Sequence, residues 1–78
     1  MSSTTALGRT LSRHLASNGV SHRAAADRIG VAPSTLSKAL RGQRPLLMTY
    51  LGEISTLVEV SPSMLVEEAE LERDWPSA

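Results

Sequence analysis

The sequence predicts an all-α fold, a compact five-helix bundle in one small domain over residues 1–74, with a short tail at 75–78. No stretch alternates polar and apolar residues with the period of two that strands require, and the chain has one Trp, one Tyr and no Phe. Apolar residues instead recur with helical spacing between breaks that contain Ser, Gly or Pro. We therefore expect helices at about residues 5–17, 22–29, 33–41, 47–58 and 62–74.

The first helix is predicted by a leucine stripe at helical spacing, formed by Leu7, Leu11 and Leu15. Ser3 or Thr4 is suited to the N-cap position, and Gly19 to the stop at the C-terminal end. Gly8 is expected to weaken the first turn, because glycine loses more backbone freedom in a helix than other residues do.

The next two helices are separated by a short turn. Ser21 is a suitable N-cap for the second helix, and Gly30 ends it, since glycine readily adopts a left-handed conformation. Pro33 opens the third helix, where a missing N–H costs nothing, and Gly42 stops it.

The last two helices follow a loop. An apolar stripe predicts the fourth, and it consists of Leu47, Tyr50, Leu51, Ile54, Leu57 and Val58. Ser61 caps the fifth helix and Pro62 opens it.

The third helix separates into two faces on a helical wheel. The apolar face, which we expect to anchor the helix to the core, consists of Leu36, Ala39 and Leu40. The opposite face is polar and cationic, and it consists of Ser34, Ser37, Lys38 and Arg41. Such side chains can reach base edges in a DNA major groove, which is wide enough to admit an α-helix.

The turn before this helix follows the helix-turn-helix pattern. Ala26 is small where two helices must approach closely, Gly30 follows four positions later, and Val31 fills the angle between the helices. The stretches SHRAAADRIGVAPSTLSKALRG, GQRP and YLGEISTLVEVSPSMLVE extend the pattern over about residues 7–65. This region resembles the Cro and phage-repressor type of helix-turn-helix protein, the lambda-repressor-like family. The resemblance implies a five-helix bundle that binds operator DNA, commonly as a dimer, with its third helix in the major groove.

Carried over position by position, the resemblance implies base contacts from Pro33, Ser34, Ser37 and Lys38. Phosphate contacts are expected from Ser21, His22, Arg23, Arg41, Gln43 and Arg44. His22 stands where the family often has a phosphate-binding Gln, and Ser21 is first of all a cap.

Three positions depart from the family's pattern. Pro33 stands where many relatives have a base-reading Gln, so base contacts are expected to be few. Ala25 stands where a larger aliphatic residue is usual, and Glu59 replaces the glycine that often closes the fourth helix.

The formal net charge is zero, but the charges are segregated along the chain. Residues 1–45 hold seven Arg or Lys residues against one Asp, and residues 46–78 hold one Arg against seven Asp or Glu residues. The basic half is the electrostatic pattern of a surface that binds a polyanion. A solvated basic surface without a partner is the alternative interpretation.

The fifth helix has more apolar residues than one core-facing side needs. Leu65, Val66 and Ala69 lie on one side. A second apolar arc consists of Met64, Leu71 and Trp75, which we expect to form a homodimer interface. The alternative is that Trp75 folds back on the first helix.

Catalytic and metal-binding functions are not expected. The chain has no cysteine, which suits a reducing cytosol, and neither His14 nor His22 has an acidic partner at ligand spacing. The acids of the fifth helix are interpreted as a solvated face rather than as catalytic carboxylates. We expect no cofactor, no small-molecule substrate and no membrane association, since the longest apolar run cannot span a bilayer.

The sequence therefore predicts a DNA-binding transcriptional regulator, a repressor that occupies an operator as a dimer in the cytosol of a prokaryote or a phage-infected host. We expect no effector or catalytic domain in the remaining length. The alternative is a helical antitoxin or adaptor that acts through protein contacts of its acidic C-terminal helix.

Overall fold

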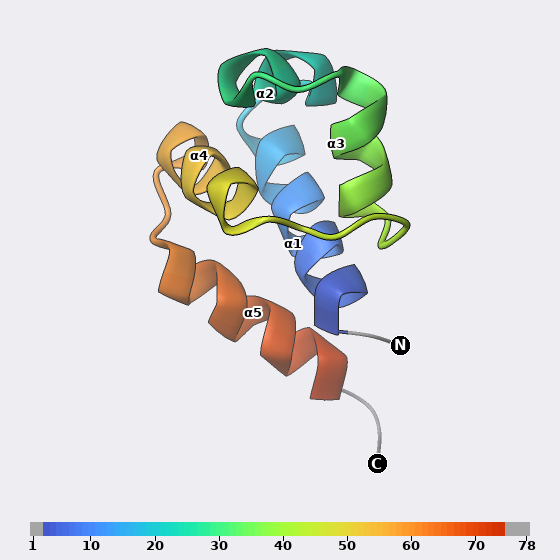
Figure 1. Cartoon of the computed structure of the whole chain (residues 1–78). Coiled ribbons are helices and arrows are strands. Elements are labelled where there is room, and N and C mark those ends of the chain that lie inside the picture. The colour runs from blue at the N-terminus through green and yellow to red at the C-terminus, as the bar shows by residue number, and fades with distance from the viewer. Residues whose placement is uncertain (1–2, 75–78) are drawn as a thin grey trace.

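The computed structural model describes residues 3–74, with side chains for residues 5–71. Five helices follow one another in it: α1 (Ser3–Ser17), α2 (His22–Ile29), α3 (Pro33–Leu40), α4 (Met48–Val58) and α5 (Pro62–Asp74) (Figure 1). There is no strand between residues 3 and 74. The predicted all-α fold class is confirmed.

The first helix organises the bundle. α1 packs against α3, α4 and α5, and its most extensive contact is with α5. α2 lies across the other end of the bundle and packs against α3 and α4 (Figure 1). The polar face of α3 therefore points away from the core, and α5 lies at a distance from this polar face.

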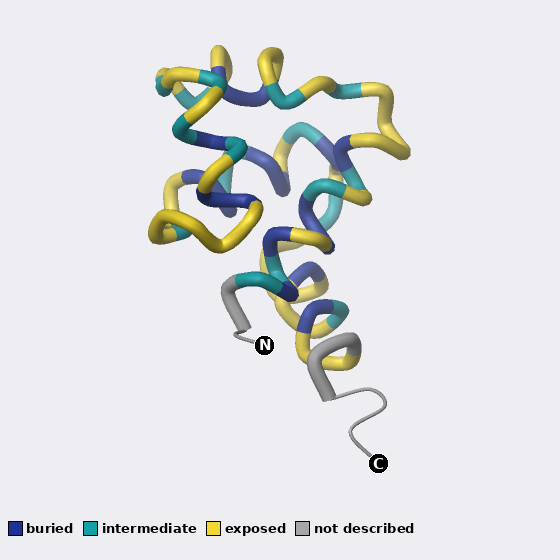
Figure 2. Tube along the Cα trace, turned by 90° about the vertical axis from the view of Figure 1, so that its right-hand side faces the viewer, coloured by how far each residue is buried: buried dark blue, intermediate teal, exposed yellow. Residues whose placement is uncertain are grey.

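Each helix buries one side, as Figure 2 shows along the chain. The predicted stripe of α1 is confirmed, because Leu11 and Leu15 are fully buried and Leu7 packs on the core. The stripe predicted for the fourth helix is wrong at Leu47, which precedes α4 and is 50% exposed. Val66 also lies at the edge of the buried side of α5 rather than within it.

Two predicted helix starts need correction. α1 already begins at Ser3, so Ser3 and Thr4 lie inside the helix and neither is its N-cap. α4 begins at Met48, one residue later than expected, and its N-cap Leu47 makes no side-chain capping hydrogen bond. α3 ends at Leu40 with Arg41 as its cap. These shifts of one or two residues are typical of helix ends, where side-chain preferences compete with the packing of the first turn.

Four helices end in the same way, with a residue in the left-handed conformation: Gly19, Gly30, Gly42 and Glu59. In each case the N–H of the next residue donates to the carbonyl five residues earlier, at N···O distances of 2.8 to 3.1 Å. Glu59, with φ of 57°, is the one non-glycine residue with positive φ between residues 3 and 74. The family that the sequence resembles often has a glycine at this position. Glu59 adopts the same left-handed conformation, although glycine is better suited to it.

Gly8 has a packing role that its helical position did not reveal. A Cβ added to Gly8 would overlap the carbonyl oxygen of Leu40, at the end of α3. The absence of a side chain therefore lets the backbone of α1 lie directly against the end of α3.

None of the helices within residues 3–74 has the length and the hydropathy that crossing a lipid bilayer requires.

Candidate nucleic-acid interface

The unit formed by α2, the turn and α3 has the conformation that the sequence predicted. Ser21 caps α2, accepting a hydrogen bond from the N–H of Ala24 at 3.0 Å. Gly30, with φ of 92°, ends α2 and donates its N–H to the carbonyl of Ala26 at 2.8 Å. Ala26 is fully buried, and Val31 packs on the core from within the turn. Three residues, 30–32, therefore connect α2 to α3, which begins at Pro33.

The two predicted faces of α3 are confirmed. Leu36, Ala39 and Leu40 are 0 to 2% exposed and hold the helix on the core. On the opposite side, Ser34 and Lys38 are exposed, as is Arg41 directly after the helix, while Pro33 and Ser37 are half-buried. The polar face therefore combines hydroxyl groups that can donate or accept with cationic groups that only donate.

A hydrogen bond connects the start of α2 to this face. Nδ1 of His22 lies 3.3 Å from Oγ of Ser37. The sequence predicts a phosphate contact for His22 and a base contact for Ser37, and nothing in it connects the two residues. The two residues are fifteen positions apart in the sequence, and only the turn at Gly30 brings the start of α2 beside α3.

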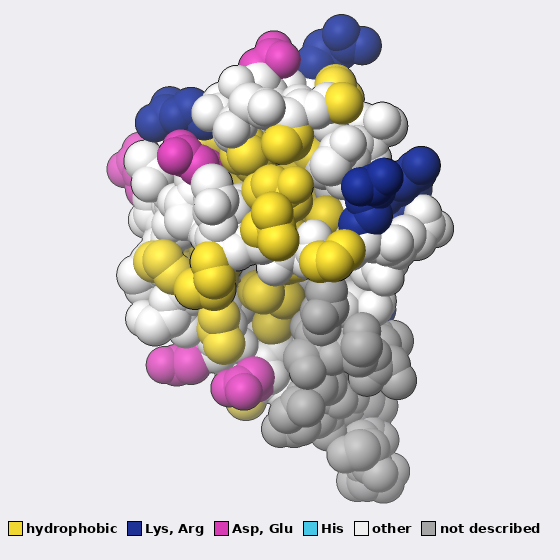
Figure 3. Space-filling model, viewed as in Figure 1, with side chains coloured by type: hydrophobic (Ala, Val, Ile, Leu, Met, Phe, Trp, Pro, Cys, Tyr) yellow, Lys and Arg dark blue, Asp and Glu magenta, His cyan; other side chains and the backbone are white. Residues whose placement is uncertain are grey.

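Four cations on or near the polar face of α3 have no protein partner among the described residues. Arg23, Lys38, Arg41 and Arg44 are exposed and make no hydrogen bond or ion pair with the described side chains of residues 5–71. We call this set the cation group; it lies on α2, on α3 and in the loop that follows α3. In Figure 3, basic side chains at the right-hand edge stand apart from acidic ones, some of which lie at the lower left.

Other arginines are paired with carboxylates. Nη2 of Arg13 lies 3.5 Å from Oε1 of Glu68, and Nε of Arg28 lies 3.4 Å from Oε1 of Glu53. This pairing affects DNA binding, because a cation that already interacts with a protein carboxylate gains less binding free energy from a phosphate. The structure thus separates Arg13 and Arg28, which are paired with carboxylates, from the four residues of the cation group.

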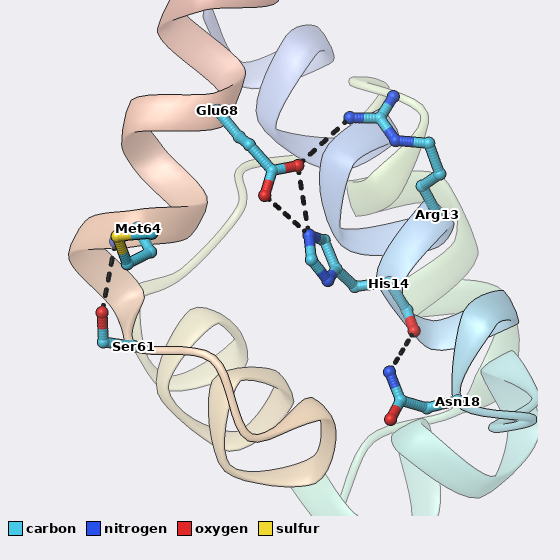
Figure 4. Close-up of polar contacts among 6 residues, drawn as sticks. All are labelled: Arg13, His14, Asn18, Ser61, Met64 and Glu68. Carbon is cyan, nitrogen blue, oxygen red and sulfur yellow. Dashed lines mark hydrogen bonds and ion pairs between the residues drawn. The ribbon is translucent and has the colours of Figure 1, made fainter.

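His14 belongs to the paired region and not to the polar face. Its Nε2 lies 2.9 and 3.1 Å from the two carboxylate oxygens of Glu68, which also contacts Arg13 (Figure 4). Glu68 follows His14 by 54 positions, which is not a ligand spacing in the sequence, and only the packing of α5 on α1 brings the two side chains together. No group of three or more His, Cys, Asp or Glu side chains able to hold a metal ion occurs among the described residues.

Two of the three predicted dimer residues, Met64 and Leu71, lie on α5. Met64 is 54% and Leu71 72% exposed, whereas Leu65 and Ala69 face the core. Trp75 lies outside the described residues. The second apolar arc of α5 is therefore open to solvent at two of its three predicted members.

Comparison with known families decides the classification. A family model described as a helix-turn-helix domain matches residues 6–71. The chain belongs to the helix-turn-helix family. The match covers α2, α3 and the helices that support them, so the family and the geometry agree on the same unit. No curated protein matches this helix-turn-helix protein by sequence.

Solved structures of one protein are similar to this helix-turn-helix chain. A crystal structure of the clp gene regulator ClgR from Corynebacterium glutamicum has a TM-score of 0.85 and 26% sequence identity, covering 92% of this chain and 77% of that chain. A second ClgR structure has a TM-score of 0.82 at 26% identity, covering 92% of this chain and 94% of that chain. The five-helix arrangement is therefore shared with a gene regulator over nearly the whole described length.

Proposed function

We propose that this helix-turn-helix protein is a sequence-specific DNA-binding regulator of transcription that acts as a repressor and binds its operator as a dimer. The observation that carries the proposal is the polar face of α3, exposed beside the cation group. An exposed short helix with hydroxyl and ammonium groups, flanked by unpaired cations, suits a major groove bordered by phosphates. The likeness to ClgR, a gene regulator, supports the regulatory role.

In this proposal α3 lies in the major groove. Ser34, Ser37 and Lys38 face base edges, and Pro33 contributes only van der Waals contact because it has no N–H. The start of α2 approaches the backbone on one side of the groove. There the unsatisfied N–H groups of a helix N-terminus, together with His22 and Arg23, favour a phosphate.

The loop after α3 approaches the opposite strand. Arg41, Gln43 and Arg44 are all exposed there, directly beyond the recognition helix. Contacts from both ends of α3 orient the helix along the groove, while the side chains between them read the sequence. Occupancy of an operator then blocks transcription sterically, which requires no catalytic chemistry.

Dimerisation through the exposed arc of α5 completes the proposal. A recognition helix with three short or flexible base-reading side chains specifies few base pairs, and a second copy doubles the site. Two copies related by a two-fold axis present their α3 helices about 34 Å apart, matching half-sites one turn of DNA apart. Met64 and Leu71, exposed on α5, supply apolar surface for such a contact.

Selection of bound duplexes from a random pool tests the proposal. We expect enrichment of an inverted repeat with half-site centres about 10 base pairs apart. Enrichment of one half-site alone would overturn the dimer. Failure to enrich any duplex, together with co-purification of a protein partner that requires exposed α5 residues, would favour the antitoxin or adaptor function instead.

A further inference from the structure

We infer that His22 is a positioning residue that makes Ser37 a hydrogen-bond acceptor toward the base it faces. The inference rests on the proposed DNA-binding function and names a specificity determinant within it. His22 is the first residue of α2, and Ser37 lies in the second turn of α3. Their 3.3 Å contact is the one hydrogen bond that the Ser37 hydroxyl makes among the described residues.

The direction of this hydrogen bond follows from the chemistry of the two ring nitrogens. A neutral imidazole carries one N–H, and a phosphate oxygen only accepts. When Nε2 of the neutral His22 ring binds a phosphate, the single proton must therefore be on Nε2, and Nδ1 keeps its lone pair. Nδ1 then accepts the hydroxyl proton of Ser37.

The consequence for Ser37 is a fixed polarity. A serine hydroxyl has one proton and two lone pairs, and here the proton is directed to His22. Only the lone pairs remain for DNA, so Ser37 can bind a group that donates. In the major groove the donating groups are the exocyclic amino groups, N6 of adenine and N4 of cytosine. His22 would thus select the base without touching it.

The half-buried position of both residues supports this role. Ser34, one turn earlier on the same face, is exposed and makes no hydrogen bond with the described residues, so its hydroxyl can rotate. Ser37 is half-buried and tied to a ring that is itself half-buried. A hydroxyl with one orientation discriminates donors from acceptors better than a freely rotating one.

Two substitutions of His22 separate its two nitrogens. In His22→Asn the side-chain amide ends close to the position of Nδ1, so it can still accept from Ser37. In His22→Gln the amide extends to the position of Nε2, so it can still contact a phosphate but loses Ser37. Ser37→Ala removes the hydroxyl group that is inferred to contact the base. His14→Gln is the matched control, since His14 pairs with Glu68 on the α1–α5 side of the molecule.

The first readout is the base preference of each variant in selections at pH 8, above the ordinary range of imidazole titration. Comparison of the wild type with Ser37→Ala identifies the base pair that depends on Ser37. We expect His22→Gln to lose the preference at that base pair alone, and His22→Asn and His14→Gln to keep it. Retention of the preference in His22→Gln, or no Ser37-dependent base pair in an otherwise enriched site, would overturn the inference and leave the proposed function intact. If the wild type enriches no duplex, both fail.

The second readout tests the polarity directly. The adenine or cytosine of the Ser37-dependent base pair is replaced by the analogue that lacks its exocyclic amino group. We expect the wild type to bind this duplex about fivefold more weakly, the effect of one hydrogen bond, and Ser37→Ala and His22→Gln to bind both duplexes equally. Unchanged wild-type affinity for the analogue would show that Ser37 does not accept from that amino group.

Discussion

Gly8 and Leu40 bring α1 and α3 into direct backbone contact. A Cβ on Gly8 would overlap the carbonyl oxygen of Leu40, the last residue of α3. The contact fixes the end of α3 relative to the rest of the bundle, immediately before the loop that holds Arg41 and Arg44. Glycine in a helix interior costs stability, so its presence here reflects the close approach of the two backbones.

Gly8→Ala should therefore destabilise the protein by about 2–3 kcal/mol, because the overlap is with backbone and only a shift of α3 relieves it. Gly52→Ala in α4 is the matched control. A Cβ there meets nothing within 4 Å, and alanine should stabilise the helix by up to about 1 kcal/mol. Urea unfolding of both variants gives the two free energies. Equal effects would contradict the packing role of Gly8.

Glu59→Gly should stabilise the protein by about 0.5–1 kcal/mol. Glu59 ends α4 in the left-handed conformation, which costs an L-residue about 1–2 kcal/mol, and the greater freedom of unfolded glycine offsets part of the gain. Gly30→Ala, the reverse change at the end of α2, should destabilise. The same unfolding measurement checks both, and a destabilised Glu59→Gly would indicate that the Glu59 side chain makes a compensating contact.

Lys38→Ala should weaken the free energy of binding by about 1–3 kcal/mol for the preferred duplex and by little for a scrambled one, because Lys38 is exposed on the base-reading face of α3. Ser34→Ala should cost less, since an unrestrained hydroxyl gives weaker discrimination. Titration of both variants against matched and scrambled duplexes measures the difference. An equal loss of affinity for the two duplexes would indicate that Lys38 contacts phosphates rather than bases.

Binding should depend strongly on salt although the net charge is zero. If each subunit neutralises about four phosphates, a dimer releases about eight counterions, and the slope of log K against log[salt] is about −7. Arg44→Ala should flatten this slope and keep the sequence preference. Arg28→Ala is the control, because Arg28 is paired with Glu53 and should leave the slope unchanged. A slope near zero in the wild type would refute the role of the cation group.

Met64→Glu should shift the protein from dimer to monomer at micromolar concentration, because it adds charge to an apolar surface on an already acidic helix. Met48→Glu is the matched control, since Met48 is still more exposed but lies on α4. Sedimentation equilibrium distinguishes the two variants. Truncation of α5 is a weaker test, because Ala69 is buried and Glu68 pairs with His14. A wild-type monomer at this concentration would contradict the proposed interface.

Local patterns in the sequence predicted most of the fold. The spacing of Leu11 and Leu15, the cap at Ser21 and the stop at Gly30 each act within one or two helical turns, and the structure confirms them. The same locality explains the errors. The stripe through Leu47 fits helical spacing, but its burial depends on where the loop before α4 lies, which no periodicity encodes.

Side-chain spacing along single helices was enough to predict which helices form and which residues of α3 face away from the core. Which polar groups meet depends on how the helices pack, and spacing along one helix does not encode that. The packing of α5 on α1 pairs His14 with Glu68, and the turn after α2 joins His22 to Ser37. Helix packing also sets which cations remain available to a polyanion. A count of charges along the chain treats Arg28 and Arg44 alike, whereas the presence of a nearby carboxylate depends on three-dimensional packing.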